Sequence, residues 1–320
     1  GEEDAAYLDK TGYELPADLR FKEHRLETIR QAKAALEARE AELNPDQAID
    51  DKKQISFADT EARIMGKGKD FDYRYNGQIS VDSDHQIIVG QHLSQHANDQ
   101  QEVGEALKAI QSATGDQLPE KMSLDNGYYS GTNLHVLEAA AIDSYVSVGR
   151  GEADAPDKDG GHQVQLHKIH FIYDEGADGF HCPGGHWLAL KQVNTAGKRV
   201  YQAEQSDCAT CPHQKRCCRS TTGQARTITT DDKESLRQAM REKMAASEAK
   251  AIYRRRKAIV EPVFGHIKNG GFRGFSLRGK EKVAGEFSLV CAAHNLKKMV
   301  KAAMTGLVRP AFGQWVAKVG

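Results

Sequence analysis

The sequence contains no long apolar run. Across its 320 residues, no stretch approaches the roughly 18 consecutive apolar residues that a membrane-spanning helix needs. The first residues also hold no apolar segment of the kind found in secretory signals. Hydrophobic residues make up 39% of the chain and charged residues 28%, which is typical of globular proteins. We therefore expect a soluble protein of one large or two small domains, with no membrane partner. The chain begins with Gly1 rather than Met, which favours a fragment or a processed start.

The sequence also has almost no net charge. The balance of −1 by itself argues against a nucleic-acid-binding protein, but the charges are unevenly distributed. Residues 241–320 hold 17 Lys and Arg against 5 Asp and Glu, whereas the preceding 240 residues hold 27 against 40. A basic final third is what a phosphate-contacting surface needs, and an acidic remainder can supply metal-binding carboxylates. Solvated charged faces without a partner are the alternative.

Cysteine is scarce, and five of the six cysteines fall between Cys182 and Cys218. In a chain without a secretory signal, such a cluster favours a metal site over disulfides. The sixth, Cys291, stands in an apolar stretch, so we expect it in the core. We predict a structural Zn²⁺ held by four thiolates, from Cys182, Cys208, Cys211 and either Cys217 or Cys218. His181, His186 and His213 are competing ligands, and free thiols are the alternative to a metal site.

The first half of the sequence predicts a helical arm followed by an α/β core. Residues 16–44 are rich in Ala, Leu, Glu, Lys and Arg, which predicts one long, strongly charged helix. Residues 72–82 and 86–93 predict two strands of a hairpin. Residues 98–113 predict a helix capped by Asn98, with three apolar residues along one side: Val103, Leu107 and Ile110.

The pattern continues with a short strand that ends in a turn at Asp125, a helix over 130–140 and a strand over 143–149. Alternating strands and helices predict a mixed α/β sheet with crossover helices. Residues 151–230 interrupt this order with a Gly/Asp-rich stretch, a hairpin around the first cysteine and the cysteine cluster, so we expect an inserted module. Helical sequence resumes near residue 232, and a last helix covers about 280–304. The predicted segments are an arm (1–55), a first core part (56–150), the module (151–230), the C-terminal helices (231–305) and a tail (306–320).

Two acidic residues stand out by their surroundings. Asp125 follows a strand, so its carboxylate would lie at the C-terminal edge of the sheet, where α/β folds place their sites. Glu261 lies in a basic helical stretch, seven residues before Lys268 and therefore on the same helix face. A helix carboxylate beside a sheet-edge carboxylate is one way to build a divalent-metal site. The alternatives are that Asp125 is a turn residue and that Glu261 is a first-turn acid, with Pro262 marking a helix start or kink.

The order of several motifs resembles that of the DDE transposases of bacterial insertion sequences. Tyr253, Arg256, Glu261 and Lys268 are spaced like the Tyr–Arg–Glu–Lys motif of that family. The spacing from Arg to Glu is one residue longer than usual, and Lys257 occupies the usual Arg position. The segments DTEARIM, YNGQISVD, LDNGYYSG and VEPVFGHIK, with the sequence after them, are similar to segments of one subgroup that also has a helical arm and a cysteine module. The resemblance covers nearly the whole chain.

The resemblance implies an RNase H-like catalytic core in which Asp125 and Glu261 are the second and third catalytic carboxylates. The family's first catalytic Asp lies on a strand upstream of the long charged helix, and no matching segment is present. Asp59 and Asp82 are candidate substitutes, but Asp59 matches a non-catalytic position and Asp82 is expected at a strand end. We therefore expect a fragment or a decayed copy that lacks the first carboxylate.

The implied activity is metal-dependent cleavage of DNA at the ends of an insertion sequence, followed by strand transfer. Two divalent ions, Mg²⁺ or Mn²⁺, would stabilise the attacking and leaving oxygens, and Mg²⁺ prefers scattered carboxylates, waters and phosphate oxygens. Positively charged side chains would contact phosphate without reading sequence, and a tyrosine would stack or hydrogen-bond near the cut strand. These DNA-binding residues are Tyr253, Arg254, Arg255, Arg256, Lys257 and Lys268. The alternative is that the basic run is a solvent-exposed helix face that contacts no DNA.

The resemblance also implies partners and a location. DNA at element ends and targets is the expected partner, a homo-oligomer is expected in the synaptic complex, and the location would be cytoplasmic and nucleoid-associated. Two other functions remain open: a nuclease of the same fold that cuts without joining, and an inactive DNA-binding remnant.

Overall fold

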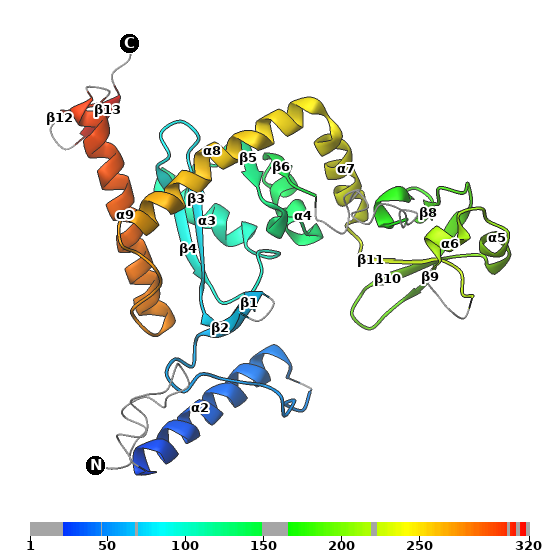
Figure 1. Cartoon of the computed structure of the whole chain (residues 1–320), viewed down its shortest axis with the longest axis horizontal. Coiled ribbons are helices and arrows are strands. Elements are labelled where there is room, and N and C mark those ends of the chain that lie inside the picture. Colours follow the sequence, from blue (N-terminus) through cyan, green and yellow to red (C-terminus); the bar gives the residue numbers. More distant parts are fainter. Residues whose placement is uncertain are drawn as a thin grey trace. The chain divides into compact units, whose positions relative to one another are not determined.

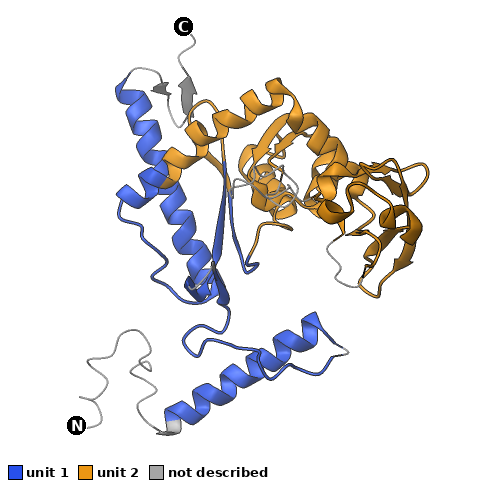
Figure 2. Ribbon diagram, turned by 45° about the vertical axis from the view of Figure 1, so that its right-hand side comes forward, with its two compact units in different colours: residues 1–80, 91–97, 265–320 blue, residues 81–90, 98–264 orange. Residues whose placement is uncertain are grey.

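The computed structural model describes residues 22–45, 47–67, 70–148, 166–218, 223–305, 308–311 and 314–317. Residues 16–21 of the predicted arm helix and the Gly/Asp-rich stretch 151–161 lie outside these ranges. The chain divides into two compact units (Figure 2). Unit 1 comprises 1–80, 91–97 and 265–320, and unit 2 comprises 81–90 and 98–264. Helices and several sheets alternate along the chain (Figure 1), which confirms an α/β fold. The five-segment division stays a prediction.

Unit 1 begins with the predicted arm helix, α2 (Lys22–Leu43), which is followed by the antiparallel pair β1 (Arg63–Lys67) and β2 (Asp70–Arg74). Strand β3 (Asn76–Val81) and strand β4 (Ile88–Ser94) then form a separate two-stranded sheet. The prediction of one strand over 72–82 is therefore wrong. The strand structure is interrupted at Tyr75. The Tyr75 hydroxyl donates to both carboxylate oxygens of Asp59, at 3.0 and 2.9 Å.

The last predicted helix is confirmed as α9 (Lys280–Met304), which is followed by the hairpin of β12 (Val308–Ala311) and β13 (Gln314–Ala317). Within unit 1, α9 packs on the β3–β4 sheet. A Cβ added to Gly77 would lie 3.1 Å from the Phe287 ring, so β3 needs glycine there. The Gln91 amide donates to the Ser288 hydroxyl at 2.8 Å.

Unit 2 contains the predicted strand–helix–strand crossover. Strand β5 (Lys121–Leu124) pairs in parallel with β6 (Asp143–Val146), and α4 (Gly131–Ala139) connects them (Figure 1). Helix α3 (Val103–Thr114) buries the predicted apolar side: Val103, Leu107 and Ile110. These residues join the buried faces of α4, β5, β6 and a later helix in one hydrophobic core.

The predicted N-cap of α3 is wrong. The helix begins at Val103, later than expected, and its N-cap residue Glu102 makes no side-chain capping bond; the Asn133 side chain accepts a hydrogen bond from the Val103 N–H at 3.3 Å. The Asn98 side chain instead accepts a hydrogen bond from the backbone of Gln100 at 3.1 Å. Asn favours such local turns because its short side chain reaches its own backbone two residues on.

The cysteine-rich module of unit 2 is a five-stranded antiparallel sheet with the order β11-β10-β9-β8-β7. Its strands are β7 (Ile172–Asp174), β8 (Gly179–His181), β9 (Trp187–Val193), β10 (Arg199–Ala203) and β11 (Thr227–Thr230). Two short helices, α5 (Gln205–Ala209) and α6 (Gln214–Cys217), precede β11. A separate hydrophobic core, centred on Phe171, Phe180 and Tyr201, fills the module. The predicted hairpin around the first cysteine is confirmed as β8–β9.

The helical sequence after residue 232 forms two helices, α7 (Glu234–Ala245) and α8 (Ser247–Asn269). They separate at Ala246, whose backbone is extended. The carboxylate of Glu234 is fully buried and ties α7 to the module: it accepts hydrogen bonds from Lys168, from Thr230 Oγ1 at 2.6 Å and from Arg241 at 2.9 Å. Among the described helices, none is both long and apolar enough to cross a membrane.

Candidate functional site

Asp125 lies directly after β5, as predicted, and its side chain organises the turn that follows. Its Oδ1 accepts a hydrogen bond from the backbone N–H of Gly127 at 2.8 Å and so caps the short 3-10 turn Asn126–Tyr128. The turn role expected from the sequence is therefore real. The hydrogen bond to Gly127 uses one carboxylate oxygen of Asp125, and the side chain is half-buried at the edge of the sheet.

A second carboxylate, which the sequence did not single out, lies beside Asp125. A Cβ added to Gly127 would come within 2.7 Å of Asp99 Oδ2 and 3.0 Å of Asp125 Oδ1. Two negatively charged oxygens therefore face the same glycine, and any larger residue at that position would push them aside. Asp99 lies in the loop before α3, where nothing in the sequence pattern marks it as functional.

Arg256 of α8 reaches this acidic edge. Burial, followed by the negative charges of Asp99, Asp125 and Glu102, raises the pKa of Tyr128, and the positive charge of Arg256 opposes that rise. The carboxylates, the phenol and the guanidinium therefore share one electrostatic environment within unit 2. Arg256 and Asp125 are therefore both near enough to Tyr128 to influence its pKa.

The rest of the basic run has two different environments. The Tyr253 ring packs against the core of unit 2, with the guanidinium carbon of Arg256 5.7 Å from its centroid. The Nε of Arg256 is buried and has no hydrogen-bond partner in the described part of the chain. Arg254, Arg255 and Lys257 are exposed to solvent. The run is therefore not one uniform face, because Arg256 alone among its four cations turns inward.

Glu261 lies well inside α8 and is exposed. It is not a first-turn acid, so that alternative is wrong, and Pro262 is inside the helix rather than at its start. Proline has no N–H, so the carbonyl four residues earlier loses its helical donor. The side-chain amide of Gln86 supplies one instead, donating to Ala258 O at 2.8 Å and to Ile259 O at 3.3 Å. Lys268 follows in the same helix and is also exposed.

The two candidate substitutes for a first carboxylate hold local structure. Asp82 accepts hydrogen bonds from the backbone of Asp84, His85 and Ile87 in the β3–β4 turn. Asp59 accepts from Tyr75 and from the backbone of Gly279. Across the described residues, no three His, Cys, Asp or Glu side chains lie close enough together to hold a metal ion. The predicted magnesium and zinc sites therefore stay predictions.

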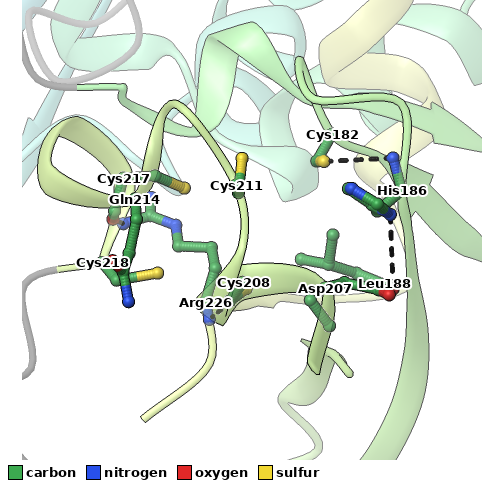
Figure 3. Close-up of a pocket in the computed structure, with 11 residues that line it drawn as sticks. Cys182, His186, Leu188, Asp207, Cys208, Cys211, Gln214, Cys217, Cys218 and Arg226 are labelled. Atoms are coloured by element: carbon green, nitrogen blue, oxygen red, sulfur yellow. Dashed lines mark hydrogen bonds and ion pairs between the residues drawn. The ribbon is translucent and has the colours of Figure 1, made fainter. Parts of the chain in front are cut away.

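The cysteines of the module surround a small cavity of about 20 Å³ (Figure 3). The side chains that line it include those of Cys182, Cys208, Cys211, Cys217 and Cys218. Gly184 lets two of them approach, because a Cβ there would lie 3.1 Å from Cys211 Sγ and 3.6 Å from Cys182 Sγ. Cys182 Sγ also accepts the backbone N–H of His186 at 3.3 Å. Burial raises the pKa of the Cys208, Cys217 and Cys218 thiols.

Arg226 places a positive charge at this cavity. Its backbone N–H donates to Cys208 Sγ at 3.5 Å, and its guanidinium donates to the Cys217 carbonyl at 3.0 Å. Its Nε is buried without a hydrogen-bond partner among the described residues. No pattern in the sequence marks Arg226 as part of this site. A cation beside several thiols stabilises their deprotonated form, which is the form that binds metals. Cys291, by contrast, is buried in α9 as expected, and burial raises its pKa to about 12.

Comparison with known families finds a similarity over part of the chain. Residues 181–300 match the family described as the transposase DDE domain. The matched segment runs from the end of β8 into α9 and includes Glu261 and the whole cysteine cluster, whereas Asp125 lies before it. The match supports a DDE transposase and so confirms the resemblance seen in the sequence at that level. Neither the curated proteins nor the solved structures gave a match.

Proposed function

We propose that this chain is the catalytic part of a DNA transposase that cleaves the ends of an insertion sequence and joins them to a target. The family match over residues 181–300 carries the proposal. The parallel β5–β6 pair with its α4 crossover and the acidic edge after β5 support an RNase H-like core. In this interpretation Asp125 and Glu261 are the catalytic carboxylates, and DNA is the partner.

The acidic edge fits a divalent cation. Its donors are carboxylate oxygens, which Mg²⁺ and Mn²⁺ prefer, and two of them already face Gly127. Asp125 and Glu261 would hold the ion, with Asp99 beside Asp125 adding negative charge. When bound, the ion would withdraw electron density from the scissile phosphate and favour deprotonation of the attacking hydroxyl.

The chain's own residues would position DNA for the reaction. In the first step a water oxygen bonds to phosphorus as the bond from phosphorus to the 3′ oxygen breaks, which leaves a 3′-OH. In the second step that 3′-OH attacks a target phosphodiester and releases a new 3′-OH, so the number of phosphodiester bonds is conserved. The exposed cations Arg254, Arg255, Lys257 and Lys268 would contact phosphates and set the register of the strand.

A cleavage and strand-transfer assay tests this proposal. Full-length protein would be mixed with duplexes carrying the element's terminal repeats and with Mg²⁺ or Mn²⁺. We expect nicking at the ends and joined products, both lost in Glu261→Gln and Asp125→Asn but retained in the matched α8 control Glu248→Gln. Nicking without joining would favour the nuclease alternative. Binding to repeat DNA without nicking would favour the inactive remnant, and retained activity in Glu261→Gln would overturn the site.

We also propose that the cysteine-lined cavity holds a structural Zn²⁺. Cys182, Cys208, Cys211 and Cys217 or Cys218 would bind it as thiolates, and the adjacent Arg226 would offset part of their negative charge. The described sulfur atoms do not yet meet at one point, so binding would draw them inward by closing the small cavity. The ion would connect α5 and α6 to the β8–β9 hairpin and take no part in DNA cleavage.

Metal analysis of the purified chain tests the zinc site. We expect about one Zn²⁺ per chain, lost in Cys182→Ser, Cys208→Ser and Cys211→Ser but kept in the core control Cys291→Ala. Loss in only one of Cys217→Ser and Cys218→Ser would identify the fourth ligand, and loss in His186→Ala instead would assign that role to the imidazole. Wild-type protein with no bound zinc, and with thiols that react equally with and without a chelator, would contradict the proposal.

A further inference from the structure

Unit 1 contains a cleft that none of the proposed chemistry uses. The end of α8, the loop after it and one face of α9 line a space of about 420 Å³. All of these segments belong to unit 1, drawn in blue in Figure 2. The volume lies within the range of roughly 300–1,000 Å³ found for small-molecule sites. The cleft is therefore large enough for a ligand rather than for a few waters.

One wall of the cleft is basic. Lys297, Lys298 and Lys301 line it from α9, and no Asp or Glu is among its lining residues. In the part of the chain that the structure describes, neither Lys297 nor Lys301 forms an ion pair. Lys297 and Lys301 lie one helical turn apart, so their ammonium groups repel each other and an anion between them would be stabilising. The lining therefore favours a ligand with at least one phosphate.

The lining also includes flat rings. His294, on α9 beside the lysines, stacks its imidazole on that of His266 from α8, with centroids 5.9 Å apart and planes 23° from parallel. The Phe272 ring also lines the cleft and is held edge-to-face by Phe275, at a centroid distance of 5.3 Å. Nucleic-acid bases stack on such rings with little regard to base identity. Cations that can bind phosphate and rings that can stack on a base are the two elements of a nucleotide site, and both line this cleft.

We propose that this cleft binds one unpaired nucleotide of a single-stranded DNA segment. Lys297 and Lys301 would contact its phosphate, and Phe272 would stack on its base. The inference rests on the proposed function, since it makes DNA the ligand. It adds a binding site distinct from the carboxylates, which places a contact with unpaired DNA on the basic C-terminal part of the chain.

Fluorescence anisotropy with a labelled oligothymidylate strand tests the cleft directly and needs no cleavage. For single strands, the logarithm of affinity falls with the logarithm of salt by about 0.7 per phosphate contact. We expect the Lys297→Ala/Lys301→Ala variant to reduce that slope by about 1.4 and to weaken binding. The matched control is Lys282→Ala, an exposed lysine of α9 outside the cleft. Phe272→Leu keeps an apolar side chain but removes the ring, and it should cost roughly five- to hundredfold in affinity.

The outcomes separate this inference from the proposed activity. The binding assay involves no cleavage, so a failed cleavage assay would not affect its result. Competition by thymidine monophosphate would show that a single nucleotide suffices, whereas competition by oligonucleotides alone would show that the cleft needs a strand. An unchanged salt slope in the double variant, or an equal loss in Lys282→Ala, would overturn the cleft as a site. Unchanged affinity in Phe272→Leu would overturn its stacking role.

Discussion

Asp99 and Asp125 turn carboxylate oxygens toward the same glycine, with Asp99 Oδ2 and Asp125 Oδ1 2.7 and 3.0 Å from where a Cβ of Gly127 would stand. Each residue belongs to a different loop, one before α3 and one after β5. Like charges held this close are costly unless a cation or hydrogen-bond donors neutralise them. The pairing therefore adds Asp99 to the carboxylates that we propose to act at the C-terminal edge of β5.

Asp99→Asn should weaken metal-dependent cleavage without unfolding the chain. The substitution keeps the shape of the side chain and the Asp99 carbonyl, which accepts the Asn133 amide at 2.8 Å. Losing a charge next to a metal ligand typically costs roughly 10- to 100-fold in metal affinity or activity. Nicking rate against Mn²⁺ concentration measures the effect, with exposed Asp116→Asn as the control. If the nicking rate of Asp99→Asn depended on Mn²⁺ concentration as that of the wild type does, Asp99 would be excluded from the site.

Arg256→Ala should reduce cleavage far more than Lys257→Ala. Arg256 is turned inward beside Tyr253 and Tyr128, whereas Lys257 is exposed, although Lys257 occupies the position where the family motif has arginine. An inward guanidinium can hold a phosphate near Asp125, and an exposed ammonium mainly adds screened attraction. The comparison uses single-turnover nicking at two salt concentrations. A larger loss in Lys257→Ala would instead assign the role of the motif arginine to Lys257, which stands at the usual spacing from Glu261.

Glu234→Gln should destabilise unit 2 strongly. The Glu234 carboxylate is fully buried and bonded to Lys168 and Arg241, and burial alone would raise its pKa, but these positive charges lower it overall. Removing one side of a buried charge network leaves the other charges uncompensated and typically costs about 3–5 kcal/mol. Urea unfolding measures the loss in free energy, with exposed Glu242→Gln as the control. A difference below about 1 kcal/mol would show that the network contributes little.

Acid should weaken the contact between α7 and the loop before it. Burial would raise the pKa of Asp231, but the hydrogen bonds and charge of Arg237 lower it well below the usual range. A lowered pKa means that the stabilisation is present above the unfolded value of about 3.9 and is lost as pH falls below it. The difference in unfolding free energy between wild type and Asp231→Asn, roughly 1.5–3 kcal/mol at pH 7, should therefore shrink from pH 5 to pH 3. A constant difference over that range would contradict the assignment.

Much of the fold could be predicted because local patterns determine it. Regular apolar spacing located α3, and strand propensity followed by a turn located β5 and Asp125. The separation of β2 from β3 could not be predicted, since it depends on Tyr75 bonding to Asp59, 16 residues away. The start of α3 could not be predicted, because the Asn98 side chain is able to cap a helix but bonds the backbone of Gln100 in a local turn instead.

The candidate site was only partly predictable for the same physical reason. Asp125 and Arg256 could be found by motif, whereas Asp99 and Arg226 act through tertiary neighbours that no local spacing encodes. The basic cleft has the same origin, because its stacked imidazoles, His266 and His294, come from different helices. Spacing identified Glu261 as a family residue, but only the helix shows that Gln86 compensates the carbonyl that Pro262 leaves without a donor.

Titration calorimetry with Mn²⁺ tests the central claim, that Asp125 and Glu261 bind a divalent metal, whether or not the chain cleaves DNA. We expect wild-type protein to bind Mn²⁺, Asp125→Asn and Glu261→Gln each to bind it at least about tenfold more weakly, and Glu248→Gln to bind it as the wild type does. Equal affinity in the wild type and both carboxylate variants would contradict the proposed active site.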